Sequence, residues 1–152
     1  MKVYQSPIGQ ILVVCSEKGV SKLVFDDPNE MESHENEMES HFANQLDEYF
    51  DRKRTVFDLP LDLQGTEFQL RVWNELLKIP FGRTITYKEL AIKLGNLKAI
   101  RAVGTANGAN PVSIIVPCHR VIGSDGSLTG YAGGLWRKKW LLDFESQDFS
   151  LF

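Results

Sequence analysis

Three short runs at the start of the chain alternate apolar and polar residues, and this pattern predicts strands. The runs are KVYQ, QILVVC and SKLVF, and turn-forming residues separate them at 6–9 and 17–19. Alternation with a period of two, bounded by Gly, Pro and Ser, is typical of β-strands joined by tight turns. We therefore expect a small antiparallel sheet in which the three strands follow one another as a meander.

The apolar positions then change period and recur every three or four residues, as they do on one face of an α-helix. These positions are Met31, His34, Met38, Phe42, Leu46 and Tyr49. The charged block DRKR at 51–54 ends the predicted helix. Apolar residues alternate again between 57 and 63, but Pro60 restricts this segment to an edge strand or a linker. We place a domain boundary near Gly65, so that residues 1–64 form an N-terminal α/β domain.

The second domain, residues 65–152, is predicted to be mainly helical. Thr66 and Gln69 have the spacing of a capping box, which begins a helix. Its apolar stripe is Phe68, Val72, Leu76 and Ile79, and Pro80 follows. A second capping signal at Thr86 begins another helix, which Gly95 is placed to close. The apolar face of that helix is Tyr87, Leu90, Ala91 and Leu94.

A third helix is predicted over about residues 97–109, and its side chains are unusually small. Ile100 and Val103 are expected to face the core, while Lys98 and Arg101 face outward. A helix, a short glycine-containing turn and a slim second helix indicate a helix-turn-helix, whose second helix can approach DNA closely. An ordinary helical hairpin with tight packing is the alternative interpretation. The expected fold class is therefore α+β: a small antiparallel sheet with a helix, then a mainly helical domain with a helix-turn-helix.

The candidate chemistry lies in the pentapeptide VPCHR, residues 116–120. The apolar run at 114–116 predicts a buried strand that would hold Cys118 rigidly at its end. A thiol beside an imidazole is a candidate nucleophile, because His119 is able to take the proton of the thiol. By themselves these two residues are equally compatible with a thiol hydrolase, an acyltransferase or a redox enzyme, so the sequence around them has to decide.

The formal net charge of −3 hides a division along the chain. Residues 1–67 carry 6 Lys/Arg against 14 Asp/Glu, whereas residues 68–145 carry 11 against 5. A basic half of this kind indicates a polyanionic partner, although helices with solvated lysines produce milder versions of it. No stretch approaches the roughly 20 apolar residues of a membrane span, and the N-terminus lacks the pattern of a signal peptide. We expect an intracellular, cytoplasmic protein.

The two cysteines, Cys15 and Cys118, match no disulfide or metal framework, which favours a reducing compartment. Cys15 lies in the apolar run ILVVC, and we interpret it as a buried structural residue. His34 and His41 lie seven residues apart on the predicted helix, too far to bind one ion easily. We therefore expect no metal and, in particular, no structural zinc.

Three motifs in the second half have the order and spacing of one protein family. They are RAVGTANGANP at 101–111, VPCHRVIG at 116–123 and GYAGG at 130–134, and FQLRVWNELLKIPFG and TYKELA precede them. With these motifs the chain resembles the O6-alkylguanine-DNA alkyltransferases over residues 66–145. The N-terminal half is similar to that family mainly in its length and in its order of strands and helix. The resemblance implies double-stranded DNA containing O6-alkylguanine as the partner, no cofactor, and a monomeric protein.

The resemblance implies a part in the transfer reaction for five residues. Cys118 would accept the alkyl group, His119 would take the thiol proton through a bound water, and Glu145 would fix the tautomer of the imidazole. Tyr87 would donate to guanine N3 while negative charge develops on the leaving base, and Asn110 would brace the turn before the active-site strand. From the residues alone, Tyr87 is equally a core residue, Glu145 a solvated residue near a helix end and Asn110 a helix C-cap.

A second group of residues is implied in recognition of DNA and of the base. Arg101 would enter the duplex and fill the space that an extruded base leaves. Ala102 and Thr105 belong to the same slim helix, which in the family enters the minor groove. The base pocket would be lined by Val121, Tyr131 and Ala132. Because Ala132 stands where some members have serine, the range of accepted alkyl groups does not follow from the resemblance.

The implied function is DNA repair by stoichiometric transfer of an alkyl group, methyl above all, from O6-alkylguanine to Cys118, with O4-alkylthymine as a further candidate substrate. A thioether offers water no carbonyl to attack, so each molecule would act once. The alternative is a non-catalytic alkyltransferase-like protein that senses lesions, although that group typically has tryptophan in place of the cysteine. A plain helix-turn-helix regulator would need a dimer or an effector domain, and the acidic half indicates neither.

Overall fold

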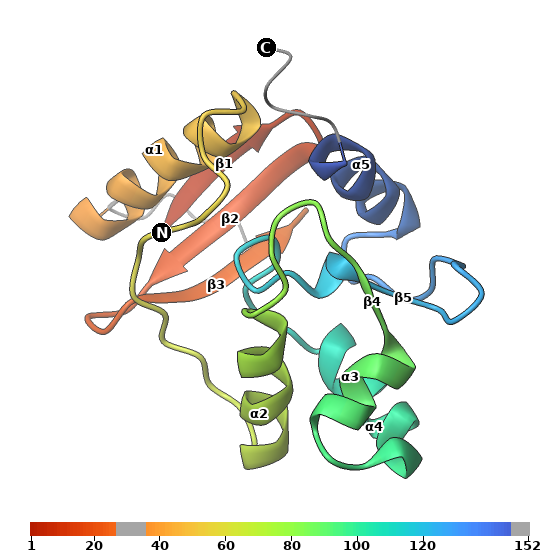
Figure 1. Ribbon diagram of the computed structural model, residues 1–152. Coiled ribbons are helices and arrows are strands. Elements are labelled where there is room, and N and C mark those ends of the chain that lie inside the picture. Colours follow the sequence, from red (N-terminus) through yellow and green to blue (C-terminus); the bar gives the residue numbers. More distant parts are fainter. Residues whose placement is uncertain (27–35, 147–152) are drawn as a thin grey trace. The chain divides into compact units, whose positions relative to one another are not determined.

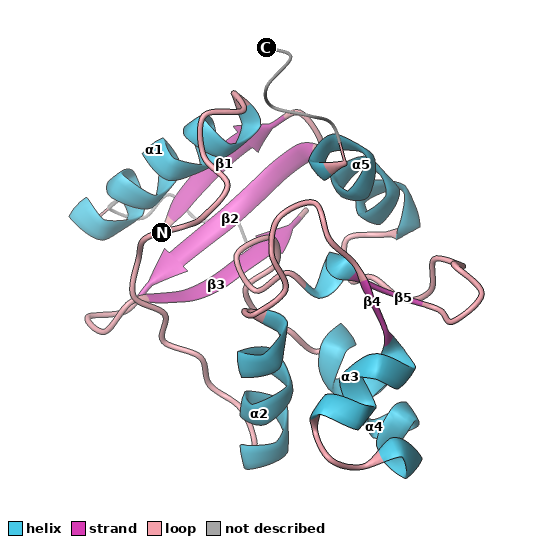
Figure 2. Cartoon of the chain, in the orientation of Figure 1, coloured by secondary structure: helices cyan, strands magenta, loops and turns pink. Residues whose placement is uncertain are grey.

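The computed structural model describes residues 1–26 and 36–146 and divides into two compact units, Met1–Gln64 and Gly65–Phe152 (Figure 1). The first unit has a three-stranded sheet and a helix, and the second has most of the helices together with a short pair of strands (Figure 2). This composition confirms the expected α+β class. Within the described ranges, no helix is long and apolar enough to cross a membrane.

The sheet of the N-terminal unit is the predicted meander. Its strands are β1 (Lys2–Ser6), β2 (Gly9–Cys15) and β3 (Val20–Phe25), which pair antiparallel in the order β1-β2-β3. Gly9 has a φ of 106° in the first turn, a conformation that suits a residue without a Cβ. Ile11, Val13 and Leu23 are fully buried, so the apolar positions of the strands form the core of this unit.

Helix α1 (Glu37–Phe50) is the helix that the apolar periodicity predicts, and its buried positions include Phe42, Leu46 and Tyr49. Two of the residues used for that prediction, Met31 and His34, lie outside the described residues. The segment after the helix is mainly a linker, with one isolated bridge between Val20 and Leu61. Gln45 fixes this linker, because its amide donates to Asp58 O (3.0 Å) and accepts from Asp58 N (2.9 Å).

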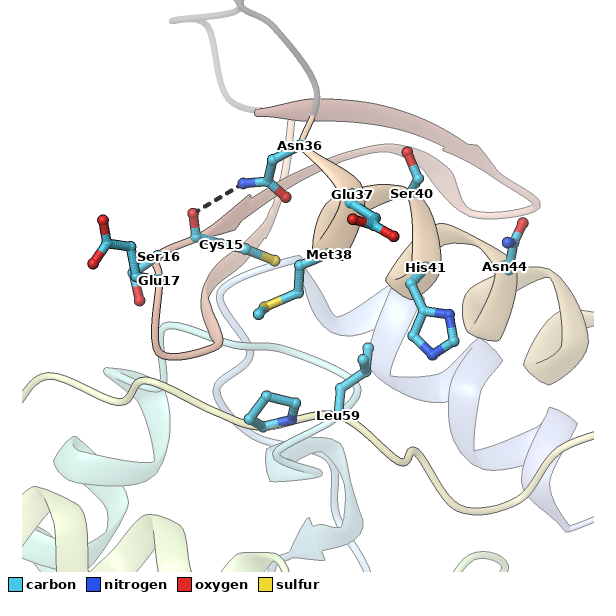
Figure 3. A pocket seen from close by; sticks show the side chains of 11 residues that line it. Cys15, Ser16, Glu17, Asn36, Glu37, Met38, Ser40, His41, Asn44 and Leu59 are labelled. Atoms are coloured by element: carbon cyan, nitrogen blue, oxygen red, sulfur yellow. Dashed lines mark hydrogen bonds between the residues drawn. The ribbon is translucent and has the colours of Figure 1, made fainter.

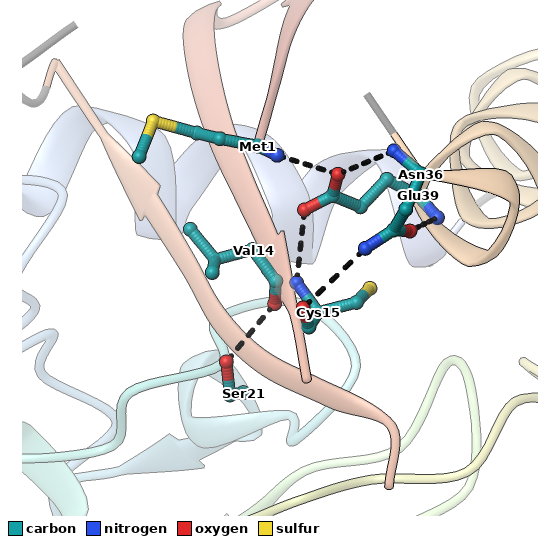
Figure 4. Close-up of polar contacts among 6 residues, drawn as sticks. All are labelled: Met1, Val14, Cys15, Ser21, Asn36 and Glu39. Atoms are coloured by element: carbon teal, nitrogen blue, oxygen red, sulfur yellow. Dashed lines mark hydrogen bonds and ion pairs between the residues drawn. The ribbon is translucent and has the colours of Figure 1, made fainter. Parts of the chain in front are cut away.

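Glu39 on α1 links the helix to the sheet within the N-terminal unit (Figure 4). Its fully buried carboxylate accepts hydrogen bonds from the α-amino group of Met1 (2.5 Å), Cys15 N (3.0 Å) and Asn36 N (3.0 Å). Burial alone would raise the pKa of Glu39, but these donors favour the charged form and leave the pKa below its ordinary value. The buried charge is therefore compensated.

The second unit is built from short helices. They are α2 (Glu67–Leu76), α3 (Tyr87–Lys93), α4 (Ile100–Gly108) and α5 (Leu135–Glu145), with 3-10 turns η1 (Leu97–Ala99) and η2 (Cys118–Arg120). Helices α2 and α3 begin at the predicted caps Thr66 and Thr86. Thr66 and Gln69 form the reciprocal capping box, and Thr86 accepts from Glu89 N (3.0 Å). Strands β4 (Ile85–Thr86) and β5 (Val121–Ile122) pair in parallel.

Two details of the helices differ from the sequence-based expectation. Helix α2 ends at Leu76, before Pro80, and its core side includes Trp73, which is 1% exposed and donates Nε1–H to Ala106 O (2.9 Å). The slim helix begins as the 3-10 turn η1, and this leaves Ile100 37% exposed, so its predicted core position is wrong. Val103, in contrast, is fully buried as expected.

The predicted buried strand before Cys118 is wrong, because residues 113–115 form a turn and 116–117 belong to no strand. Asn110 closes the segment from both ends: Oδ1 accepts from Val112 N (3.0 Å) and Nδ2 donates to Val116 O (2.8 Å). Ile114 has a φ of 72°, which a strand does not permit and which is rare for a β-branched residue. The run is apolar because its side chains are buried, and burial by itself does not distinguish a strand from a packed turn.

Candidate active site

Cys118 begins the 3-10 turn η2 and is 5% exposed. Burial raises the pKa of its thiol, while the Asn110 amide and the nearby Lys138 ammonium lower it. The chain is not extended at this point, because Cys118, His119 and Arg120 form the 3-10 turn. The Asn110 amide acts on the site in two ways, since it shapes the turn that carries Cys118 and favours the thiolate.

His119 is fully buried and forms an ordered pair with Glu145 at the end of α5. The distance from Nε2 to Glu145 Oε2 is 2.9 Å. Burial lowers the pKa of His119, so the imidazole is neutral at pH 7. Hydrogen bonds from His119 and Arg120, together with the positive charge of Arg120, outweigh burial at Glu145 and hold its pKa well below the ordinary value. A carboxylate accepts, and therefore Nε2 carries the hydrogen. Nδ1 is left as a basic lone pair with no hydrogen-bond partner in the part of the chain that the structure describes.

Arg120 completes this arrangement, although the sequence analysis did not select it. Its Nε and Nη2 atoms donate to the two oxygens of Glu145 at 2.7 and 2.9 Å, and Nη1 donates to Ile79 O at 2.8 Å. The guanidinium is 7% exposed and lies 5.8 Å from the centre of the Phe81 ring. Bidentate pairing fixes the plane of the Glu145 carboxylate, and that plane in turn fixes the imidazole.

Lys138 is the second charged residue that the sequence analysis did not select. It is 0% exposed on α5, where its ammonium donates to Thr129 O (2.9 Å) and lies 3.5 Å from the Tyr87 hydroxyl. Burial lowers the pKa of Lys138, and the proximity of Cys118 opposes that shift. A sequence signal existed, because positions 138, 141 and 145 share one helical face and a lysine stands among residues expected to face the core.

Tyr87 is the first residue of α3, and its ring is half-buried. The hydroxyl donates to Thr129 O at 3.0 Å. Burial raises the pKa of the phenol. Tyr87 thus belongs to the same cluster as Cys118 and Lys138.

Helix α4 has one polar, exposed face and one buried face. Arg101, Ala102 and Thr105 are exposed, and the Thr105 hydroxyl donates to Arg101 O at 3.0 Å. Val103, Ala106 and Asn107 lie on the buried face. Helices α3 and α4 with the turn between them have the arrangement of a helix-turn-helix, and the exposed residues of the second helix are small apart from Ile100 and Arg101.

The residues predicted to line a base pocket do not share one environment. Val121 is fully buried in β5, where it pairs with Ile85, so its side chain packs in the core of the unit. Tyr131 is half-buried and Ala132 is exposed. Burial is also the main cause of a strongly raised pKa at Tyr131. The loop carrying Tyr131 and Ala132 ends at Gly134, whose φ is 91°.

The N-terminal unit has a cleft of its own, of about 970 Å³ (Figure 3). Its wall includes Cys15, Met38, His41, Leu59 and Pro60. Cys15 is half-buried rather than buried, and burial raises the pKa of its thiol to about 11. The thiol is therefore protonated at neutral pH and is a poor nucleophile, in agreement with the interpretation of Cys15 as structural.

Comparison with known proteins matches both halves of the chain. A family model described as "6-O-methylguanine DNA methyltransferase, DNA binding domain" matches residues 67–147, and one described as the "ribonuclease-like domain" of the same proteins matches residues 1–63. A "Methylated-DNA--protein-cysteine methyltransferase" of Methanosarcina barkeri is 48% identical over an alignment of 152 positions, which covers 96% of each chain. The protein with that description in Mycobacterium tuberculosis is 55% identical over an alignment of 114 positions, which covers 72% of this chain and 69% of the relative.

Solved structures are similar over nearly the whole chain. Mycobacterium tuberculosis OGT in complex with DNA is 44% identical, with 95% of this chain and 91% of that chain covered, and the TM-score is 0.87. An O6-methylguanine DNA methyltransferase from Methanococcus jannaschii is 26% identical, with 97% and 94% covered and a TM-score of 0.73.

Proposed function

The chain belongs to the 6-O-methylguanine DNA methyltransferase family, and we propose that Cys118 is the residue that accepts the alkyl group. The function is repair of alkylated DNA by stoichiometric transfer of the alkyl group to a cysteine of the protein, and the partner is DNA that carries O6-alkylguanine. The observation that supports Cys118 is its position beside the neutral His119, whose Nδ1 keeps a basic lone pair because Glu145 occupies Nε2.

The proposed reaction begins with the thiol proton. His119 Nδ1 takes it through a water, and the imidazolium that forms is stabilised by the Glu145 carboxylate, which Arg120 keeps ionised. The Cys118 sulfur then attacks the alkyl carbon, a C–S bond forms and the bond from carbon to guanine O6 breaks. The electron pair of that bond passes to the base.

The leaving base is stabilised by a hydrogen bond from the Tyr87 hydroxyl to guanine N3, and it ends the reaction with the proton that the thiol lost. The products are an S-alkylcysteine and an unmodified guanine, and neither carries a net charge. Water does not hydrolyse the thioether, because the thioether has no electrophilic carbonyl. Each protein molecule is therefore consumed in one reaction.

Delivery of the lesion is proposed to depend on helix α4. Exposed Arg101 would replace the extruded base in the stack, and Ala102 and Thr105 would lie against the minor groove, where small side chains permit close approach. The segment that carries Tyr131 and Ala132 would contact the extruded base. Because its substrate is DNA, we propose that the protein acts in the cytoplasm. We also propose that it acts as a monomer and without a cofactor.

A duplex with one labelled O6-methylguanine tests this proposal. Label on the protein should saturate near one per chain, should be absent with Cys118→Ala, and should persist with Cys15→Ala, which removes the other thiol. Peptide mapping should place the label on Cys118. Sustained turnover would contradict single use, and tight binding of the lesion without transfer would favour the non-catalytic lesion sensor.

A further inference from the structure

Helix α5 holds both ends of the segment that precedes it. We call residues 129–134 the pocket segment, because they include the two residues of this loop that are proposed to contact the extruded base. At its first residue, Lys138 Nζ donates to Thr129 O at 2.9 Å. Near its end, Arg137 Nη1 donates to Gly133 O at 3.0 Å, in a buried hydrogen bond. Two consecutive residues of α5 therefore fix the beginning and the end of the pocket segment.

The pocket segment is a glycine-rich turn, and a turn of this kind is costly to order. Gly130 and Gly134 have φ values of 56° and 91°, and glycine loses more conformational freedom on folding than any other residue. Between them, Gly134 N donates to Tyr131 O at 2.9 Å, which places Tyr131 and Ala132 in one turn. The contacts at the ends of this turn therefore decide how firmly Tyr131 and Ala132 are held.

Trp136 keeps the side chain of Arg137 in place. The guanidinium carbon of Arg137 lies over the Trp136 ring, 4.6 Å from the ring centre, which is a cation–π contact. Arg137 is 7% exposed, and shielding from water strengthens this attraction. The same indole lies against the end of the pocket segment, because a Cβ built on Gly134 would be 3.4 Å from Trp136 Cδ1.

Burial in the core does not explain a tryptophan at position 136. The side chain is 57% exposed in the first turn of α5, whereas large apolar residues that stabilise a core are mostly buried. Its contacts with the guanidinium of Arg137 and with Gly134 both lead to the pocket segment. This arrangement indicates that Trp136 serves the loop.

We propose that Trp136 and Arg137 are positioning residues for the target base, which act through the main chain of the pocket segment. The indole orients the guanidinium, and the guanidinium holds Gly133 O. The turn is thereby preorganised to receive an extruded purine, which lowers the entropic cost of binding the base and leaves the thiol unchanged. The proposal rests on the function proposed above, in which Tyr131 and Ala132 contact the base.

Two reactions of one thiol separate base binding from thiol chemistry. One is transfer from free labelled O6-methylguanine base, and the other is alkylation by iodoacetamide, followed on the Cys118 peptide. Trp136→Leu keeps an apolar side chain without a π face, and it should slow transfer by about fivefold, or about 1 kcal/mol in the barrier. Iodoacetamide has no purine, so its reaction with Cys118 should not slow. Trp136→Phe retains an aromatic face and should keep transfer within about twofold of the unmodified chain.

Arg137→Met tests the second member of the contact. It removes the donor to Gly133 O and should slow transfer at least as much as Trp136→Leu. Because both changes act through one guanidinium, the double variant should be no slower than Arg137→Met. Trp140→Leu is the matched control, since it removes an indole of the same helix that stacks on Phe144, with ring centres 5.0 Å apart. It should leave both rates unchanged, and the melting temperature of every variant is measured alongside.

Several results would overturn this role of Trp136 and Arg137. They are normal transfer in Trp136→Leu or Arg137→Met, equal slowing of transfer and of the iodoacetamide reaction, a Trp136→Phe variant as slow as Trp136→Leu, and a Trp140→Leu variant that loses as much. Failure of the proposed function is a separate result, since the unmodified chain would then take no label from the lesion duplex.

Discussion

Arg120 and Glu145 form a buried bidentate ion pair, with donor to acceptor distances of 2.7 and 2.9 Å. The same carboxylate accepts from His119 Nε2, so one oxygen of Glu145 serves both the guanidinium and the imidazole. Removing one partner of such a pair leaves a buried charge without compensation, which is strongly destabilising. The orientation of the imidazole and the stability of the second unit therefore depend on the same contact.

This arrangement predicts that the free energy of unfolding falls on acidification. Burial lowers the native pKa of His119, so below its ordinary value of about 6.5 the unfolded chain binds a proton that the native chain does not. The pKa of Glu145 is also lowered, and its contribution is lost only below about pH 4.3. Denaturant unfolding should show declining stability from pH 6.5 to 5, and His119→Gln should flatten this decline. A flat profile in the unmodified chain would contradict the buried neutral imidazole.

Lys138 is predicted to keep the Cys118 thiol reactive at neutral pH. The buried ammonium lowers the pKa of the thiol, so Lys138→Met should raise that pKa and reduce the thiolate fraction, by about tenfold for one pKa unit. The rate of alkylation by iodoacetamide, followed from pH 6 to 10, measures the change. Lys139→Met is the matched control, since Lys139 is exposed and pairs with Asp143. If the alkylation rate depended on pH in the same way in Lys138→Met and Lys139→Met, Lys138 would have no specific effect on the pKa of Cys118.

The local signals of the sequence predicted most of the fold. Period-two alternation identified the meander, and Thr66 and Thr86 marked helix starts because an N-cap hydrogen bond reaches only three residues along the chain. The turn before Cys118 was missed because it depends on the side chain of Asn110, and an apolar run looks the same in a strand and in a buried turn. Hydrogen bonds between a side chain and the main chain do not change the spacing of apolar residues, so that spacing does not reveal them.

The site was predictable from the sequence only in part. Cys118 and His119 were candidates because VPCHR sets a thiol beside an imidazole, whereas Glu145 came from the family resemblance, and the structure pairs Glu145 with His119. Arg120 and Lys138 needed the structure, because a charged side chain is expected from sequence to be solvated unless its buried partners are known. Val121 is the opposite case, because it lies in a family motif but its side chain packs in the core of the unit.

Arg101→Ala is predicted to slow repair within duplex DNA by about tenfold or more, because a few kcal/mol of lost stacking and pairing are then left without compensation. Reaction with the free O6-methylguanine base should keep its rate. The ratio of the two rate constants is the measurement, and Lys98→Ala, which also removes an exposed positive charge, is the control. Equal losses with duplex and free base would mean that Arg101 does not assist extrusion of the base.

Gly65→Ala should destabilise the second unit by about 1–3 kcal/mol through overpacking. A Cβ at this position would lie 2.6 Å from the ring of Trp73, whose Nε1 is fixed by its hydrogen bond to Ala106 O. Gly108→Ala is the control, because a Cβ there meets nothing within 4 Å and alanine should stabilise α4 by up to about 1 kcal/mol. Denaturant unfolding monitored by Trp fluorescence measures both changes. A neutral Gly65→Ala would show that the Trp73 ring moves freely.

Alkylation of Cys118 is predicted to destabilise the chain that carries it. The thiol is 5% exposed in a turn that Asn110 closes, so an added methyl group has to displace packed neighbours at a cost of about 1–3 kcal/mol. For a chain of this size the melting temperature should fall by roughly 3–10 °C. Calorimetry before and after stoichiometric reaction with O6-methylguanine DNA, with the oligonucleotide removed, measures the difference. Cys118→Ala taken through the same treatment should not change, and a spent form that melts at a higher temperature would mean that the site has room for the methyl group.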